Sequence, residues 1–119
     1  MTPDLYTYRA NLVRVIDGDS VVMRLSLGFH VSCVQSLRLV GVNAPELFSG
    51  TNRAVGAAAK ADCRRWFWEH QHQDDPWPYI VRTEKDRQTF GRFLGSVYDL
   101  SGNSLNEHLI AQPWQEAAP

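Results

Sequence analysis

Hydrophobic and polar positions alternate along the first third of the chain, a pattern typical of strands that bury one face. Asp17-Gly18 interrupts a first alternation, which consists of Tyr6, Tyr8, Ala10, Leu12 and the run 13–16. A second alternation keeps a strict period of two through Val21, Met23, Leu25, Leu27, Phe29, Val31 and Cys33. Gly28 within it is a candidate for a turn or bulge. Residues 36–42 form a third extended segment, closed by Pro45, which cannot donate to a β-ladder. The pattern predicts three strands.

The period changes to that of a helix between Arg53 and about His70. One helical stripe carries Val55, Ala58, Ala59, Asp62, Cys63, Trp66 and Phe67. The alanines favour helix, and Thr51 or Asn52 can supply the N-cap. We expect Trp66 and Phe67 to be core residues that pack this helix on the strands.

The rest of the chain predicts two more strands and a short helix. The polar, proline-containing segment 71–78 indicates a loop, 79–83 and 93–98 indicate strands, and 86–91 turns between them. After a turn at 101–103, residues 104–112 predict a helix that Pro113 stops. Strand-strand-strand-helix-strand-strand-helix is the order of a five-stranded OB-type Greek-key barrel, an α+β fold that is mainly β.

Composition fits one globular domain, residues 1–119. Hydrophobic residues make up 44% and charged residues 21%, and the length is sufficient to bury a core. The formal net charge of −1 excludes a strongly basic nucleic-acid-binding domain, although a local arginine cluster can still focus field in one cleft. The first residues do not resemble a signal peptide, and no apolar run approaches the roughly 18 residues of a membrane span. As the chain stands, we expect a cytoplasmic protein without membrane or obligate protein partners.

The cysteines and histidines carry no recognisable chemistry. Cys33 and Cys63 lack metal-ligand spacing, so we expect reduced core thiols, with a disulfide as the alternative. The four histidines do not match a zinc spacing, and we interpret all of them as surface residues: His30, His70, His72 and His108.

Acidic candidates follow two of the predicted strands. Asp17-Gly18-Asp19-Ser20 reads first as a hairpin turn, because Asp-Gly is a common turn signal. The strand-like residues after it would also place the Asp19 carboxylate near a barrel mouth, where it can bind a hard cation. Glu46, in Asn43-Ala44-Pro45-Glu46, is either a surface glutamate or a catalytic group held at a strand end.

Two arginines complement these carboxylates. Arg38 lies inside the apolar run Leu37-Arg38-Leu39-Val40, where it either faces outward or needs an acidic or phosphate partner. Arg92 follows Phe90-Gly91, which is consistent with an exposed hairpin arginine or with a phosphate contact beside a flat aromatic face. Fixed guanidinium groups and hard-cation ligands in one small domain indicate phosphoryl chemistry.

In order and spacing, these motifs resemble the staphylococcal (thermo)nuclease family. The resemblance covers residues 12–112 and is specific at 16–21, 38–46 and 90–92, with a further likeness in the helix 105–110. It implies an OB-type barrel and a Ca²⁺-dependent nuclease that hydrolyses DNA and RNA, single-stranded or denatured substrate being favoured, and leaves 3′-phosphate products.

The resemblance also implies a role for each motif residue. Asp19, Asn43 and Glu46 match the calcium site, and Glu46 also matches the general base that activates water. Arg38 and Arg92 match the arginines that stabilise the five-coordinate transition state. Thr89 and Phe90 match substrate-contacting positions. These assignments are expectations taken from the family.

Three departures leave a second hypothesis open. Asn43 stands where the family has an aspartate, which removes one negative charge from the calcium site. Thr89-Phe90 replaces a Lys-Tyr pair that contacts the 5′-phosphate, and after 112–114 the family's last helix is not found. The alternative is therefore a catalytically weak or inactive module that binds nucleic acid or protein. The paired arginines and Glu46 favour the enzyme.

Overall fold

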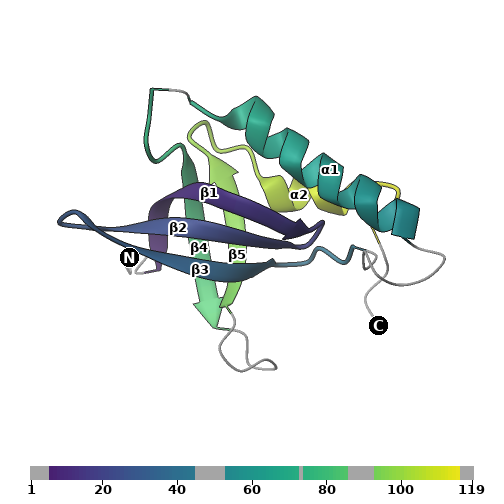
Figure 1. The fold of residues 1–119 in the computed structure, drawn as a ribbon, viewed down its shortest axis with the longest axis horizontal. Coiled ribbons are helices and arrows are strands. Elements are labelled where there is room, and N and C mark those ends of the chain that lie inside the picture. Colours follow the sequence, from purple (N-terminus) through teal and green to yellow (C-terminus); the bar gives the residue numbers. More distant parts are fainter. Residues whose placement is uncertain (1–5, 45–52, 73, 86–92, 116–119) are drawn as a thin grey trace.

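The computed structural model describes residues 6–44, 53–72, 74–85 and 93–115, which form a closed five-stranded β-barrel and two helices (Figure 1). The strands are β1 (Thr7–Asp17), β2 (Ser20–Gly28), β3 (Val31–Leu39), β4 (Tyr79–Lys85) and β5 (Phe93–Asp99). The helices are α1 (Arg53–His70) and α2 (Leu105–Ile110). The prediction of a mainly β protein built around a five-stranded barrel is thus confirmed.

The barrel closes in the order β1-β2-β3-β5-β4, with β4 paired back to β1. All neighbours are antiparallel except β3 and β5, which run parallel and pair through residues 37–39 and 93–95. A parallel pair cannot be joined by a tight hairpin. The chain between β3 and β5 includes α1, which lies across one side of the barrel (Figure 1).

The core lies inside the barrel and beneath α1. Its buried apolar residues include Val21, Met23, Leu25, Leu37, Leu39, Val81, Val97, Leu105 and Leu109. Trp66 and Phe67 are 3% and 2% exposed, so their predicted core position is confirmed. The Phe67 ring meets Tyr79 edge-on with centroids 5.0 Å apart, and the Tyr79 hydroxyl donates a hydrogen bond to the Phe67 carbonyl. These contacts fix α1 to the start of β4. At the start of α1 the predicted apolar stripe is not buried, because Val55 and Ala58 are exposed.

The second alternation, residues 21–33, predicts a longer buried face than the structure has. Its first half is buried through Leu25, but Leu27 and Val31 are exposed and Phe29 is 98% exposed. Phe29 and His30 both have positive φ, 56° and 61°, and form the tip of a β2–β3 hairpin that extends away from the helices (Figure 1). Periodicity identifies which side chains share a face, but it does not reveal where the core that covers that face ends.

The third strand also ends earlier than predicted, at Leu39. The chain turns at Val40-Gly41, where Gly41 has a φ of 77°. That backbone conformation favours glycine over any residue with a Cβ. The expected N-cap at Thr51 or Asn52 and the expected turn at 86–91 lie outside the described residues.

His70 corrects the expectation that every histidine is a surface residue. His30, His72 and His108 are exposed, but the His70 ring stacks on Trp66 with centroids 4.2 Å apart. Its Nδ1 lies 2.7 Å from the Trp66 carbonyl oxygen, and its Nε2 lies 3.9 Å from the Asp99 carboxylate. As the last residue of α1, His70 packs onto the helical turn before it.

Cys33 and Cys63 are free thiols, as expected, but Cys63 lies in the core whereas Cys33 is only half-buried. Burial, together with the nearby Asp19 and Asp62 carboxylates, raises the pKa of the Cys63 thiol to about 12. Cys63 is therefore a packing residue of α1. Among the described residues, no helix combines the length and apolar character that crossing a membrane requires.

Candidate functional site

Three residues nominated from the sequence meet where the β1–β2 turn lies against the end of β3. Asp19 belongs to that turn, Arg38 is the penultimate residue of β3, and Asn43 follows the strand. Ser20 pairs with Arg38 across the β2–β3 ladder, and the Leu39 amide donates to the Asp19 carbonyl at 2.8 Å. The ladder thus holds the turn beside the end of β3.

The Arg38 side chain bonds to Asn43. Its Nη2 donates to Asn43 Oδ1 at 2.9 Å. Leu37 and Leu39 are buried on either side, so Arg38 points away from the core and is half-buried. The outward-facing alternative is thus the one seen, and within the described ranges the partner of this guanidinium is a neutral amide and not a carboxylate. A guanidinium has more N–H donors than one amide oxygen can use, so Arg38 retains the capacity to bind an anion.

Asp19 links the β1–β2 turn to the segment after β3. Its Oδ2 accepts a hydrogen bond from the Ala44 amide at 3.2 Å, and its Oδ1 accepts one from the Ser20 hydroxyl at 3.3 Å. A carboxylate offers further lone pairs beyond these two contacts, so half-buried Asp19 can also ligate a cation. Both interpretations of Asp17–Ser20 are therefore compatible: the segment forms the turn, and its second aspartate faces residues 43–44.

Gly18 allows this turn to sit so close to its neighbours. A Cβ at Gly18 would lie 2.7 Å from the Ala59 Cβ and 2.8 Å from the Ala44 Cβ. The turn is thus packed between α1 and the segment that contains Asn43. Close approach, rather than an unusual φ, is what requires glycine here.

Asn106 fixes the end of β3 from the opposite direction. This buried α2 residue accepts a hydrogen bond from the Val97 amide at 2.9 Å and donates to the Val40 and Gly95 carbonyls at 3.0 and 3.1 Å. Its side chain therefore joins β5 to the turn that follows β3. The sequence indicated a short helix here, but the pairing of Asn106 with residues far along the chain leaves no periodic signal.

Gln115 is a further residue that sequence reasoning missed. Its Oε1 accepts a hydrogen bond from the backbone N–H of Asn43 at 2.9 Å, and its Nε2 donates one to the Gly41 carbonyl at 3.0 Å. The neighbouring Trp114 donates its indole N–H to Asp62 on α1 at 2.6 Å. The segment after α2 thereby holds both the helix and the Asn43 backbone. The only sequence signal was an aromatic and an amide placed just after Pro113.

The remaining nominated residues, Glu46, Thr89, Phe90 and Arg92, lie outside the described residues. The strand after them begins at Phe93, which pairs with Leu37, and Leu94 lies opposite Arg38. β5 therefore begins beside the part of β3 that carries the site.

The oxygen ligands available at the site are the Asp19 carboxylate and the Asn43 amide. These are hard donors of the kind that Ca²⁺ prefers, and they fit such an ion in type while supplying one negative charge between them. Within the part of the chain that is described, no group of three His, Cys, Asp or Glu side chains is arranged to hold a metal. A complete cation site would need Glu46 as well.

No protein-family model matches the chain, and no curated protein matches it at a significant level. The functional assignment therefore depends on the site's geometry and on the motifs that nominated it.

Proposed function

We propose that this chain is a Ca²⁺-dependent nuclease of the staphylococcal nuclease type, built on an OB-type Greek-key barrel, that hydrolyses phosphodiester bonds in DNA and RNA. The preference for single-stranded or denatured substrate is taken from the family resemblance. The observation that carries this function is that Asp19, from one motif, lies against Arg38 and Asn43, from another, through the hydrogen bonds Arg38–Asn43 and Asp19–Ala44.

In the proposed reaction, water attacks the phosphorus while the bond to the 5′-oxygen breaks. That oxygen takes a proton from solvent and leaves as a 5′-hydroxyl, and the other fragment keeps a 3′-phosphate. Glu46 accepts the proton of the attacking water. Arg38 and Arg92 donate to the equatorial oxygens, where negative charge gathers in the transition state. Phe90 offers its ring to a base or sugar, and Thr89 borders the same position. The roles given to Glu46, Thr89, Phe90 and Arg92 are taken from the motifs.

Asp19, Asn43 and Glu46 would hold the calcium ion. When bound, Ca²⁺ polarises the phosphate and lowers the cost of charge development at the reacting oxygens. Arg38 has a second part in this arrangement, because its bond to Oδ1 orients the Asn43 amide beside Asp19.

Degradation of denatured DNA, measured with Ca²⁺ and with EDTA, tests this function. We expect activity with Ca²⁺ only, and we expect Glu46→Gln to lower the rate by about 10²–10³ without a change in melting temperature. Glu69→Gln, an exposed carboxylate on α1, is the matched control and should retain wild-type activity. Equal rates for Glu46→Gln and Glu69→Gln in equally stable proteins would remove Glu46 from the mechanism.

One observation favours a second candidate, a nucleic-acid-binding or protein-interaction module without turnover. Asn43 lacks the charge of an aspartate, and its Oδ1 is already occupied by Arg38, so this pair is satisfied without a cation. Binding of denatured DNA with no cleavage at any concentration of Ca²⁺, Mg²⁺ or Mn²⁺ would establish the module and refute the enzyme.

A further inference from the structure

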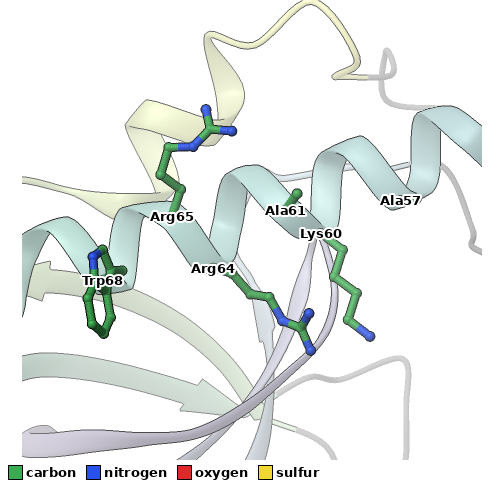
Figure 2. A pocket seen from close by; sticks show the side chains of 6 residues that line it. All are labelled: Ala57, Lys60, Ala61, Arg64, Arg65 and Trp68. Carbon is green, nitrogen blue, oxygen red and sulfur yellow. The ribbon is translucent and has the colours of Figure 1, made fainter.

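The outer flank of α1 carries a shallow hollow of about 460 Å³, away from the residues of the candidate active site. Figure 2 shows it bordered by long side chains around two small ones. Its lining residues are Ala57, Lys60, Ala61, Arg64, Arg65 and Trp68. The short side chains of Ala57 and Ala61 leave the space that the longer ones enclose. The hollow is therefore a property of the helix surface and not of the barrel.

Charge is segregated around this helix. Lys60, Arg64 and Trp68 follow one another at intervals of four residues and so lie along one flank, whereas Asp62 and Glu69 fall on another. Figure 2 shows Lys60, Arg64 and Trp68 leaving the helix on the same side and Arg65 on the opposite side.

These cations also differ in their partners. Arg65 lies 3.6 Å from Asp62, which offsets part of its charge. Over the described ranges, the side chains of Lys60 and Arg64 form no hydrogen bond and no ion pair. Two adjacent positive charges on this flank are thus available to an anion.

Trp68 is the third component of the flank. It is 72% exposed, whereas Trp66, two residues earlier, is 3% exposed and belongs to the core. Folding does not require a large aromatic at a position that the barrel does not cover. An accessible indole face beside cations is the combination with which proteins bind nucleotides, because a base stacks on the ring while its phosphate meets the charge.

We propose that the flank formed by Lys60, Arg64 and Trp68 binds single-stranded nucleic acid, with a base stacked on Trp68 and backbone phosphates at Lys60 and Arg64. The three side chains are spaced by about 6 Å along the helix axis. An unstacked strand can match that spacing, because its nucleotides are not held at the roughly 3.4 Å rise of a duplex. The site is independent of the proposed hydrolysis, since it includes none of the catalytic residues.

Other partners fit the flank less well. A duplex hides the faces of its bases, so Trp68 would add nothing to phosphate contacts. An anionic membrane surface needs a broad apolar helix face, and the apolar face of α1 is buried on the barrel through Cys63 and Phe67. An acidic polypeptide satisfies Lys60 and Arg64 but offers no flat ring to the indole.

Fluorescence anisotropy with a labelled oligodeoxythymidylate of about 16 nucleotides, in EDTA and at low salt, tests the site. We expect Trp68→Ala and Arg64→Ala each to raise the Kd about tenfold, and Trp68→Phe to retain most of the affinity because it keeps an aromatic face. The matched control is Arg24→Ala, an exposed arginine on β2, which should change the Kd by less than about twofold. In the Lys60→Ala/Arg64→Ala protein, the dependence of log Kd on log salt should fall by about 1.4, or roughly 0.7 for each lost phosphate contact.

Each contrary result overturns the assignment. Failure of the wild-type protein to bind the oligonucleotide, or an unchanged Kd in Trp68→Ala, removes the stacking site. Equal losses of affinity in Arg64→Ala and Arg24→Ala would show that binding depends on the protein's overall charge and not on this flank. Equal affinity for a duplex, or equally effective competition by polyglutamate of the same charge, shows that the flank recognises a polyanion rather than exposed bases.

Discussion

The two ends of β2 are held in different ways. At its start, the β1–β2 turn is joined to residues 43–44 through the Asp19 carboxylate, and Gly18 is packed against α1. At its end, the β2–β3 hairpin places Phe29 in solvent, and the Gly28 amide donates at 3.5 Å to the hydroxyl of Ser26, only two residues away.

This difference shows that the long-range side-chain hydrogen bonds gather at the start of β2, around the segment that follows β3. Residues from three separate regions, Asp19, Asn106 and Gln115, bond to the short segment that follows β3. The proposed nuclease site would need such a fixed backbone, because small displacements of catalytic groups sharply reduce rates. The hairpin tip has no comparable long-range support in its side-chain bonds, and its backbone adopts a strained conformation at two residues without glycine.

The largest expected effect on stability comes from a change beside the candidate site. Asn106→Ala removes the hydrogen bonds to the Val97 amide and to the Val40 and Gly95 carbonyls, of which Gly95 keeps the bond from the Val40 amide. We expect the free energy of unfolding to fall by about 3 kcal/mol or more. Urea unfolding measures this, with Asn11→Ala as control, since the side chain of exposed Asn11 accepts a hydrogen bond from its neighbour Leu12 and, over the described residues, bonds to no other group. Comparable small losses in both variants would show that Asn106 does not fix the site.

Gly18→Ala tests the close packing of the turn. An added Cβ must displace Ala59 or Ala44, and overpacking of this kind destabilises by about 1–3 kcal/mol. Nuclease activity should fall with it, because Ala44 is the residue that bonds Asp19. Ser26→Ala near the other end of β2 serves as the control. If Gly18→Ala melts at the wild-type temperature, the turn is less tightly packed than the structure indicates.

A change at the hairpin tip should have the opposite sign and a smaller size. Replacing Phe29 and His30 by Asn and Gly supplies residues that accept positive φ, and should stabilise the protein by about 1 kcal/mol. Phe29→Ala alone should alter stability by less than about 0.5 kcal/mol, since that ring is exposed. Thermal and urea unfolding of both variants provide the measurement. A loss of stability in either would indicate that the tip packs against another part of the chain.

Local patterns in the sequence predicted much of the barrel. Period-two runs located the strands, a helical stripe located α1, and the core position of Trp66 followed from its spacing within that stripe. The motifs brought Asp19, Arg38 and Asn43 to attention, and the structure brings these three together. Their chemical roles, and those of Glu46 and Arg92, remain predictions.

What the sequence could not supply depends on contacts between distant segments. Nothing near Gln115 signals that its side-chain amide will bind the Asn43 backbone. Gly28 did mark the turn or bulge beside Phe29, where the structure has a positive φ and a register shift, but it did not signal that the core ends at Leu25. The sequence left open whether Arg38 faces outward or needs an anionic partner, and it gave no sign that its guanidinium would bond to the Asn43 side chain five residues later. Such pairings are decided by how the closed barrel sets one segment beside another.

A Ca²⁺ titration of nuclease activity, comparing the wild-type protein with Asn43→Asp, tests the site most directly. An added carboxylate beside Asp19 should strengthen cation binding, and it can also form a charge-assisted bond to Arg38. We predict that Asn43→Asp reaches half-maximal hydrolysis of denatured DNA at a lower Ca²⁺ concentration and is more active at limiting Ca²⁺. Superimposable titration curves for two equally stable proteins would contradict the account, because Asn43 would then not be a calcium ligand.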